Sequence, residues 1–285
     1  MSHLPPLPSA DLPDLELATA LATGAGEVLL ELRRTVNKTD NPVDDKALRA
    51  AGDLASQEWL AAALHHARPQ DAVLSEEARD NSDRLTASRV WIIDPLDGTR
   101  EFAERTGSAE GQDGAASGET DSAWRDDFAV HIALWERGMG LTVGAVALPA
   151  RGQVFTTGNV KSQRIPRTER PLRLAASRTR PPAFLTDLAA TGAVELVPMG
   201  SAGVKVLAVV TGLVDGYLHA GGQYEWDSAA PVAVAQAAGL VATRLAGTPL
   251  QYNQPDPWLP DLFVAPPEVA PQLRKLLAGL PDEAA

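Results

Sequence analysis

The spacing of apolar residues changes along the chain from a helical to an alternating pattern. Leucines recur three to four residues apart behind Asp14, a residue type that caps helices, so the pattern predicts a helix over about 14–34. A second helix is predicted over about 45–65. Between Phe128 and Leu134 every second residue is apolar, which is typical of a strand with one buried face. The first part of the chain therefore combines helices with a sheet.

Shorter apolar runs bounded by turn residues predict the other strands of this part, at about 72–74, 89–93, 141–148 and 152–156. Pro149 to Gly152 has the composition of a hairpin turn between the last two. Beyond the polar segment 157–170 the elements alternate, with strands predicted at about 172–176, 194–198, 215–219, 240–244 and 261–265 and helices at 183–190, 202–211, 228–238 and 267–278. Alternation of this kind predicts an α/β layered fold. We expect an N-terminal α+β lobe over 1–160 and a C-terminal α/β lobe over 161–285.

Composition narrows the class of protein. The chain has 285 residues, a formal net charge of -12 and no cysteine. The length suits one two-lobed enzyme, and the lack of cysteine excludes disulfides, thiolate metal sites and catalysis by a thiol. An acidic surface repels nucleic-acid backbones, so we expect no nucleic-acid partner. The first residues do not resemble a signal peptide and no apolar run approaches the ~18 residues of a membrane span, so we expect a cytoplasmic protein that does not bind membranes.

The segment from Glu104 to Thr120 is rich in glycine, serine, alanine and acidic residues, so we expect a mobile loop. It is either a lid over a nearby site or, as we favour, a tolerated surface insertion.

Two carboxylates follow the predicted strand at 89–93. Asp94 and Asp97 stand three residues apart just past its carboxyl end, the edge where ligands bind in such sheets. Pro95 keeps Asp94 extended and Gly98 permits a sharp turn, so both side chains can converge. Hard oxygen ligands without a nearby thiolate suit Mg2+. Taken alone, however, the segment is more simply a turn, because Asp-Pro and Asp-Gly are turn formers.

Two more acidic segments lie at the ends of predicted elements. Glu76 follows the strand at 72–74, and Asp227 precedes the helix at 228–238, where it could equally serve as an N-cap. Three acidic strand or helix ends are hard to explain separately. Together they predict a metal site.

The five histidines favour structural roles. His65 and His66 end a helix, and His131 lies within the alternating strand, with no ligand-like partner near any of them in the sequence. We expect Trp91 and Trp226, which flank metal-ligand candidates, to support the site by packing.

The segments Leu74 to Glu77, Trp91 to Thr99 and Trp226 to Ala230 resemble the three signatures of the inositol monophosphatase superfamily of lithium-sensitive, Mg2+-dependent phosphatases. The resemblance covers about residues 15–270 and implies that family's five-layer αβαβα sandwich. Arg100-Glu101-Phe102 is similar to the Lys/Arg-Glu-Phe of the 3'(2'),5'-bisphosphate nucleotidases. Within that branch the chain is most similar to the actinobacterial, CysQ-type members.

The resemblance implies a site for two Mg2+ ions, with a third, weaker ion near Glu76 compatible with it. Glu76, Asp94 and the carbonyl of Leu96 would hold the first ion. Asp94, Asp97 and Asp227 would hold the second. No third-ion ligand is assigned within 38–46, because that segment departs from the family's usual lysine-containing hairpin.

The same resemblance implies a way to activate water. Thr99 and Asp53 would position and deprotonate the attacking water beside Glu76, so these three form the predicted catalytic set. Asp53 follows Gly52 here, where the family has alanine. No nucleophile from the protein is needed, and no serine–histidine–aspartate arrangement suggests one.

Substrate contacts are assigned to both lobes. The amides of Gly98 and Thr99 open a helical turn that can bind phosphate oxygens. Ser201 and Lys205 open the predicted helix at 202–211 and are candidates for a second phosphate, although an ordinary capped helix explains them equally well. The remaining substrate candidates are Ser177 and Arg178, whose segment is similar to the nucleotidases' Ser-Arg-Ser, and Asp227.

These inferences predict a phosphomonoesterase that removes the 3'-phosphate of 3'-phosphoadenosine 5'-phosphate, giving AMP and phosphate and clearing a by-product of sulfate assimilation. An inositol-1-phosphate or fructose-1,6-bisphosphate phosphatase is the enzyme alternative, because all share the metal core. A catalytically silent sensor of metal and nucleotide is the alternative of a different class. The family resemblance also implies a homodimer and inhibition by lithium.

Overall fold

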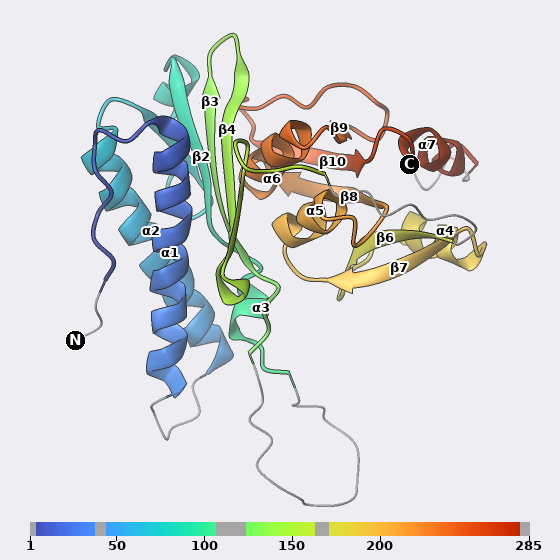
Figure 1. Cartoon of the computed structure of the whole chain (residues 1–285), viewed down its shortest axis with the longest axis horizontal. Helices are drawn as coiled ribbons and strands as arrows, with labels where there is room; N and C mark the ends of the chain where they lie inside the picture. The colour runs from blue at the N-terminus through green and yellow to red at the C-terminus, as the bar shows by residue number, and fades with distance from the viewer. Residues whose placement is uncertain (1–3, 38–43, 107–123, 163–170, 280–285) are drawn as a thin grey trace, which may run out of the picture.

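Two mixed β-sheets and the helices that cover them form the fold (Figure 1). The computed structural model describes four stretches of the chain: residues 4–37, 44–106, 124–162 and 171–279. Most of the predicted loop at 104–120, and parts of the segments 38–46 and 157–170, lie outside these stretches. Within them, every helix is too short or too polar to span a membrane.

The first sheet has the strand order β1-β2-β3-β4-β5. These strands are β1 (Ala72–Ser75), β2 (Arg89–Asp97), β3 (Ala129–Glu136), β4 (Gly140–Leu148) and β5 (Gln153–Thr156), with the short helices η1 (Ser82–Leu85), α3 (Thr99–Ala103) and η2 (Pro149–Arg151) between them. β1 pairs with β2 in parallel and the other neighbours are antiparallel. The long helices α1 (Asp14–Asn37) and α2 (Asp45–Ala67) cover the outer face, where their apolar sides form one buried cluster with the sheet.

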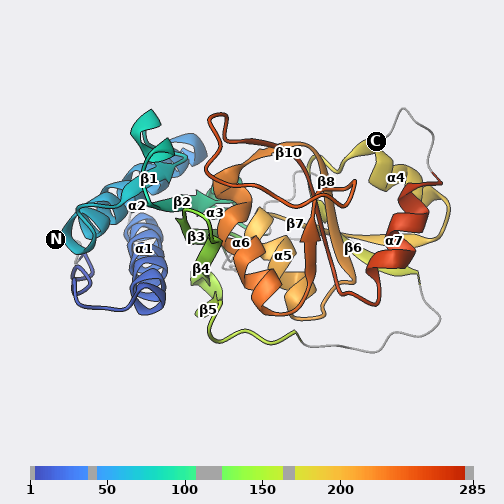
Figure 2. The same cartoon turned by 90° about the horizontal axis from the view of Figure 1, so that it is seen from above.

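The second sheet has the order β7-β6-β8-β10-β9. Its strands are β6 (Leu172–Ser177), β7 (Val194–Met199), β8 (Gly216–Tyr224), β9 (Val241–Thr243) and β10 (Trp258–Ala265). Helices α5 (Ala202–Val210) and α6 (Glu225–Ala237) lie between the two sheets, whereas α4 (Ala183–Ala190) and α7 (Ala270–Leu277) cover the far face (Figures 1 and 2). One apolar cluster surrounds α5 and α6 and another lies under α4 and α7. This layering confirms the predicted five-layer αβαβα sandwich.

The predicted elements are present with shifted ends near the acidic residues. β2 continues through Asp97, and its pairing with β3 shifts between Asp94 and Asp97. The shift is a bulge, which accommodates Pro95 because proline cannot donate a hydrogen bond to the sheet. α6 starts at Glu225 because β8 runs directly into it. The placement of Asp94 and Asp97 past the strand end is therefore corrected, and Asp227 lies inside the first turn of α6.

The predicted lobe boundary near residue 160 coincides with the change from the first sheet to the second. However, α6 belongs to the second half and packs against β2, β3 and β4 of the first. The approach is close at Gly144 in β4, where an added Cβ would lie 2.7 Å from Cβ of Ala233. Because the layers interleave in this way, the division into lobes 1–160 and 161–285 stays a prediction.

The contact between α1 and α2 gives a stability test. Gly24 in α1 faces the ring of Trp59, and an added Cβ would overlap that ring. Alanine normally favours a helix over glycine by about 1 kcal/mol, but overpacking a core costs about 1–3 kcal/mol. We expect Gly24→Ala to lower the free energy of unfolding by roughly 1–2 kcal/mol, measured by urea denaturation. Thr23→Ala, at the exposed neighbouring position, is the control, and a Gly24→Ala variant more stable than wild type would contradict the packing.

Candidate active site

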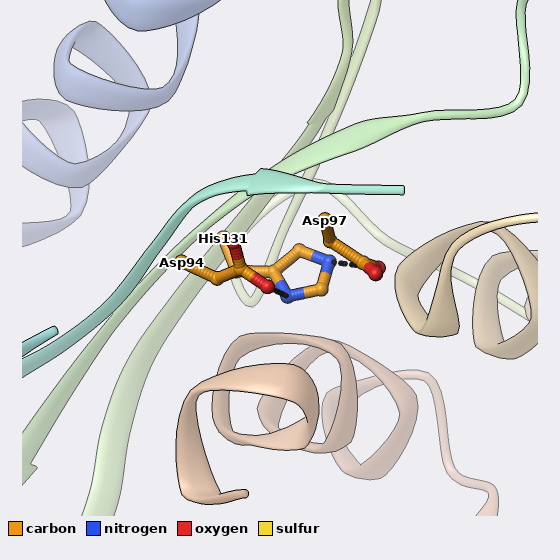
Figure 3. A group of neighbouring side chains, drawn as sticks. All are labelled: Asp94, Asp97 and His131. Atoms are coloured by element: carbon orange, nitrogen blue, oxygen red, sulfur yellow. Dashed lines mark ion pairs between the residues drawn. The ribbon is translucent and has the colours of Figure 1, made fainter. Parts of the chain in front are cut away.

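The bulge at the end of β2 presents two carboxylates on the face of the sheet that α5 and α6 cover (Figure 3). Asp94 pairs with His131 in the sheet register and Asp97 pairs with Ala129. The bulge is held by Ser56 in α2, whose Oγ donates to the carbonyl of Pro95 at 2.7 Å, and by the amide of Leu96, which donates to Asp94 Oδ1 at 3.0 Å. Both carboxylates are buried. Their positions are therefore set by contacts with protein groups rather than with water.

His131 lies between these two carboxylates (Figure 3). Its Nε2 is 3.1 Å from Asp97 Oδ2, and its Nδ1 is 3.9 Å from Asp94 Oδ2 and 3.2 Å from the carbonyl oxygen of Trp226. The imidazole is fully buried, and it fits because Gly203 has no side chain: a Cβ there would overlap Nε2. His131 therefore contacts the acidic residues of β2, partners that the sequence pattern did not show.

Glu76 and Asp227 bring two more negative charges from other elements. Glu76 follows β1, and although the residue is exposed, its carboxyl hydrogen-bonds Asp94. Asp227 Oδ2 accepts a hydrogen bond from the amide of Tyr224 at 2.6 Å, so this side chain caps α6 as well as facing the cluster. Asp227 therefore caps the helix from its third position, with Tyr224 as the N-cap residue, and its role as a metal ligand stays a prediction. Four carboxylates gather from β1, β2 and α6.

The pKa values of these carboxylates show how crowded they are. Burial, followed by repulsion from Asp227 and Asp97, raises the pKa of Glu76. Burial and then repulsion from Asp97 raise the pKa of Asp227 to about 6. Burial, followed by repulsion from Glu76, Asp97 and Asp227, raises the pKa of Asp94 well above its usual 3.8. Three acids thus hold protons more tightly than they would in water.

Asp97 behaves differently. Burial acts to raise its pKa as well, but the charge and hydrogen bond of His131, the charge of Lys205 and the hydrogen bond from Ser201 outweigh burial, so the pKa of Asp97 is lowered. This carboxylate stays ionised, with its charge balanced by the protein itself.

A divalent cation fits this group of residues. Asp94, Asp97 and His131 each offer one ligand atom, and these atoms lie within 4.8 Å of one another. Among the described residues, Asp94 Oδ2 is buried without a hydrogen-bond partner, which leaves a full acceptor for a cation. Carboxylate and carbonyl oxygens without thiolates are the donors that Mg2+ and similar hard cations prefer. A cation there would satisfy the unpaired oxygen and cancel the repulsion among the acids.

Thr99 and Asp53 meet beside this cluster, as predicted. Thr99 begins α3, and its Oγ1 lies 3.3 Å from Asp53 Oδ1 and 3.1 Å from the carbonyl oxygen of Leu96. Burial and the charge of Glu77 raise the pKa of Asp53 to about 6 although Thr99 opposes the shift. Gly52 allows α2 to approach, because an added Cβ would lie 2.7 Å from the Phe102 ring. The family's alanine is thus replaced here for a packing reason.

The candidates for a second phosphate lie close to the cluster but bind other protein groups. Ser201 Oγ donates to Asp97 Oδ2 and accepts from the amide of Val204 at 3.1 Å. Lys205 is 7% exposed, and its Nζ donates to the carbonyl oxygen of Ser201 at 2.9 Å. Arg178 pairs with Glu101 and with Asp127. Ser177 Oγ accepts a hydrogen bond from the amide of Arg180 at 3.3 Å. The roles of these residues in substrate binding stay predictions.

The sequence interpretation missed two residues of this region, His131 and Asp127. In an alternating strand, His131 stands on the face opposite Val130 and Ile132, so a polar residue there was a usable signal, but its partner depended on a register that the sequence does not show. Asp127 follows the insertion in an acidic pair with Asp126 and carried no signal. Its partners Arg178 and Gly200 lie more than fifty residues further along the chain.

Comparison with known proteins agrees with this fold. The family model "Inositol monophosphatase family" matches residues 12–278. A 3'-phosphoadenosine 5'-phosphate phosphatase of Mycobacterium leprae is 48% identical over 274 residues, covering 93% of each chain. The 3'(2'),5'-bisphosphate nucleotidase CysQ of Escherichia coli is 29% identical, over 86% of this chain and 96% of that one. The crystal structure of CysQ from Bacteroides thetaiotaomicron superposes with a TM-score of 0.67 at 25% identity, covering 89% of this chain and 97% of that one. The chain therefore belongs to the inositol monophosphatase family.

Proposed function

We propose that this protein is a Mg2+-dependent phosphomonoesterase that hydrolyses the 3'-phosphate of 3'-phosphoadenosine 5'-phosphate to give AMP and phosphate. The observation that carries the proposal is the convergence of four carboxylates around an unpaired, buried Asp94 oxygen. The substrate is supported by the name of the mycobacterial relative, which is nearly half identical along almost the whole chain. A soluble cytoplasmic homodimer acting in sulfate assimilation and inhibited by lithium is proposed on the family resemblance.

The metal assignment rests on the family resemblance and is supported by the acidic cluster described above. We assign Glu76, Asp94 and the carbonyl of Leu96 to one Mg2+, and Asp94, Asp97 and Asp227 to a second; a third, weaker ion near Glu76 is compatible with this assignment. When bound, the ions would lower the pKa of an attacking water and neutralise charge on the phosphoryl oxygens. His131 would stay in place behind Asp97 and keep it ionised.

The protein's own groups handle the water and its proton. Thr99 Oγ1 donates a hydrogen bond to Asp53 Oδ1 or to the Leu96 carbonyl oxygen, so its lone pairs can accept a hydrogen bond from the water and orient it; when the water passes a proton to Oγ1, the hydroxyl proton moves on to Asp53. Asp53, with a pKa of about 6, is mostly ionised at neutral pH yet basic enough to receive that proton through Thr99. Glu76 completes this catalytic set at the edge of the cluster.

Substrate binding is assigned to groups around the same cluster. The amides of Gly98 and Thr99 would receive the transferred phosphate. The second phosphate would lie toward the C-terminal half, where the candidates are Arg178, Ser201 and Lys205, and Ser177 and Asp227 are further candidates for substrate binding. A nucleotide bisphosphate can therefore use a second phosphate site that inositol-1-phosphate cannot use.

The direct test is a comparison of substrates. We expect kcat/KM for 3'-phosphoadenosine 5'-phosphate to exceed that for inositol-1-phosphate and fructose-1,6-bisphosphate by at least about tenfold, measured by phosphate release with and without Mg2+. A preference for inositol-1-phosphate would overturn the substrate, and no release from any substrate would favour a sensor.

A second test removes one carboxylate of the cluster. Asp94→Asn should lower kcat/KM for 3'-phosphoadenosine 5'-phosphate by at least about 100-fold and remove the thermal stabilisation by Mg2+. Asp187→Asn, on the exposed side of α4, should change neither quantity.

The hydroxyl of Thr99 can be tested separately from metal binding. Thr99→Val keeps the shape of the side chain and removes the hydroxyl, so we expect kcat to fall by about 100-fold or more. The rise in melting temperature on adding Mg2+ should persist, because no metal ligand is lost. Thr99→Ser should retain most of the activity. Full activity in the valine variant would eliminate Thr99 from the proton path.

The raised pKa of Asp53 predicts how stability depends on pH in the metal-free protein. Asp53 binds its proton more tightly when folded (about 6) than when unfolded (3.8), so the folded state holds more protons across that range. Its contribution therefore favours folding at low pH and is lost as pH rises through about 6. Asp227 acts with the same sign.

We expect urea denaturation in EDTA to show that Asp53→Asn flattens the fall in stability between pH 4 and pH 7 by roughly 1–2 kcal/mol. Glu58→Gln, also on α2, serves as the control because it removes a carboxylate outside this cluster. Identical pH profiles for wild type and Asp53→Asn would contradict the environment described for Asp53.

A further inference from the structure

The turn that opens α5 holds Asp97 from the C-terminal half of the chain. Ser201 Oγ and the amide of Gly203 both donate to Asp97 Oδ2, the latter at 2.8 Å. Both donors bind Oδ2. The other carboxylate oxygen of Asp97, Oδ1, is therefore the one that can bind a cation. The direction in which Asp97 offers that oxygen is thus set by residues 200–203.

This turn is not one that its residues would adopt on their own. The backbone of Ser201 has a φ of 43°, a left-handed conformation that residues other than glycine rarely adopt. Gly200 lies against Glu101 so closely that an added Cβ would overlap the Glu101 side chain. Support from outside the turn is therefore needed to keep it in place.

Asp127 provides that support. Its Oδ2 accepts the amide of Gly200 at 2.8 Å and a hydrogen bond from Arg178, and its Oδ1 accepts Nε of Arg125 at 3.1 Å. Burial acts to raise the pKa of Asp127, but the hydrogen bonds from Arg178, Gly200 and Arg125 outweigh burial and lower the pKa to about 2. The carboxylate is therefore ionised at neutral pH, and its bonds are charge-assisted and strong.

Arg178 links Asp127 to both sides of the site. Its backbone amide donates to the carbonyl oxygen of Met199 at 3.2 Å, directly before the turn, and its guanidinium reaches Glu101 Oε1 in α3 at 3.2 Å. The guanidinium is therefore held between two carboxylates on the first half of the chain, while its backbone is tied to the second.

We propose that Asp127, assisted by Arg178, is a positioning residue that sets the affinity of the site for its divalent cation by fixing the turn 200–203 and hence Asp97. The inference rests on the proposed metal site. It gives Arg178 a role inside the protein in place of the direct contact to phosphate predicted from the sequence.

The test compares two neighbouring aspartates. Asp127→Asn keeps the shape of the side chain, but an amide cannot accept hydrogen bonds on both sides. Asp126→Asn is the matched control, because Asp126 is exposed and pairs with Arg151 at 3.0 Å. The backbone of this segment is held independently, since Arg33 donates to the carbonyl oxygen of Arg125 at 2.8 Å, so we expect both variants to fold.

Mg2+ is titrated into metal-free protein by calorimetry without substrate. We expect the Kd of Asp127→Asn to rise by about 10–100-fold and that of Asp126→Asn to stay within about twofold of wild type. At saturating Mg2+, kcat of Asp127→Asn should stay within about threefold of wild type. Arg178→Lys should weaken Mg2+ binding in the same direction, and its titration decides the matter if Asp127→Asn does not fold.

Equal Mg2+ affinity in folded Asp127→Asn and Asp126→Asn would overturn the positioning role. So would a fall in kcat at saturating Mg2+ with unchanged metal affinity. An Arg178→Lys variant with normal Mg2+ affinity but raised KM would return Arg178 to the phosphate. If wild type itself binds no Mg2+, the proposed function fails; if wild type binds and Asp127→Asn matches it, only the positioning role fails.

Discussion

Repulsion among carboxylates that are partly removed from water is the constraint on which the site depends. The protein compensates the charge of Asp97 more fully than that of Asp94. Asp97 is surrounded by His131, Ser201, the amide of Gly203 and the charge of Lys205, and stays ionised. Asp94 accepts a hydrogen bond from the amide of Leu96 and hydrogen-bonds the carboxyl of Glu76, and its buried Oδ2 has no hydrogen-bond partner in the described residues. Groups of the protein compensate the charge of Asp97, whereas Asp94 keeps an oxygen that can bind a cation.

The groups that surround Asp94 and Asp97 come from parts of the chain that are far apart in sequence. The β2 bulge supplies the acids, the start of α5 balances Asp97, and the start of α6 adds Asp227 and the carbonyl that contacts His131. α5 and α6 can serve both sheets because they lie between them (Figure 2). Close approach requires glycine at Gly144 and Gly203, where a side chain would strike α6 or His131. The five-layer arrangement is thus a condition for the site as well as a scaffold.

The sequence predicted most of the fold because periodicity and turn residues are local signals, and it brought Glu76, Asp94, Asp97, Asp227, Thr99 and Asp53 together through motifs. What it could not show depends on contacts between distant segments. The bulge required the pairing of β2 with β3, and the role of His131 required the register of that pairing. Arg100-Glu101-Phe102, which indicated a nucleotide substrate, is mainly internal here: Glu101 pairs with Arg178, Phe102 is fully buried, and Arg100 alone is exposed. That motif reports how α3 packs as much as what the enzyme binds.

The charge distribution also constrains how an anionic substrate reaches the site. The protein carries a net charge of -12, and at close range the acids outnumber the bases that face them. The bases described near the site are already engaged, because Arg178 and Arg125 pair with acids and the buried Lys205, whose charge lowers the pKa of Asp97, binds the carbonyl of Ser201. A phosphate approaching the metal-free site would therefore meet a negative potential. A bound cation would reverse the sign of this potential, so the distribution of the protein's own charges favours binding of the cation before the phosphate.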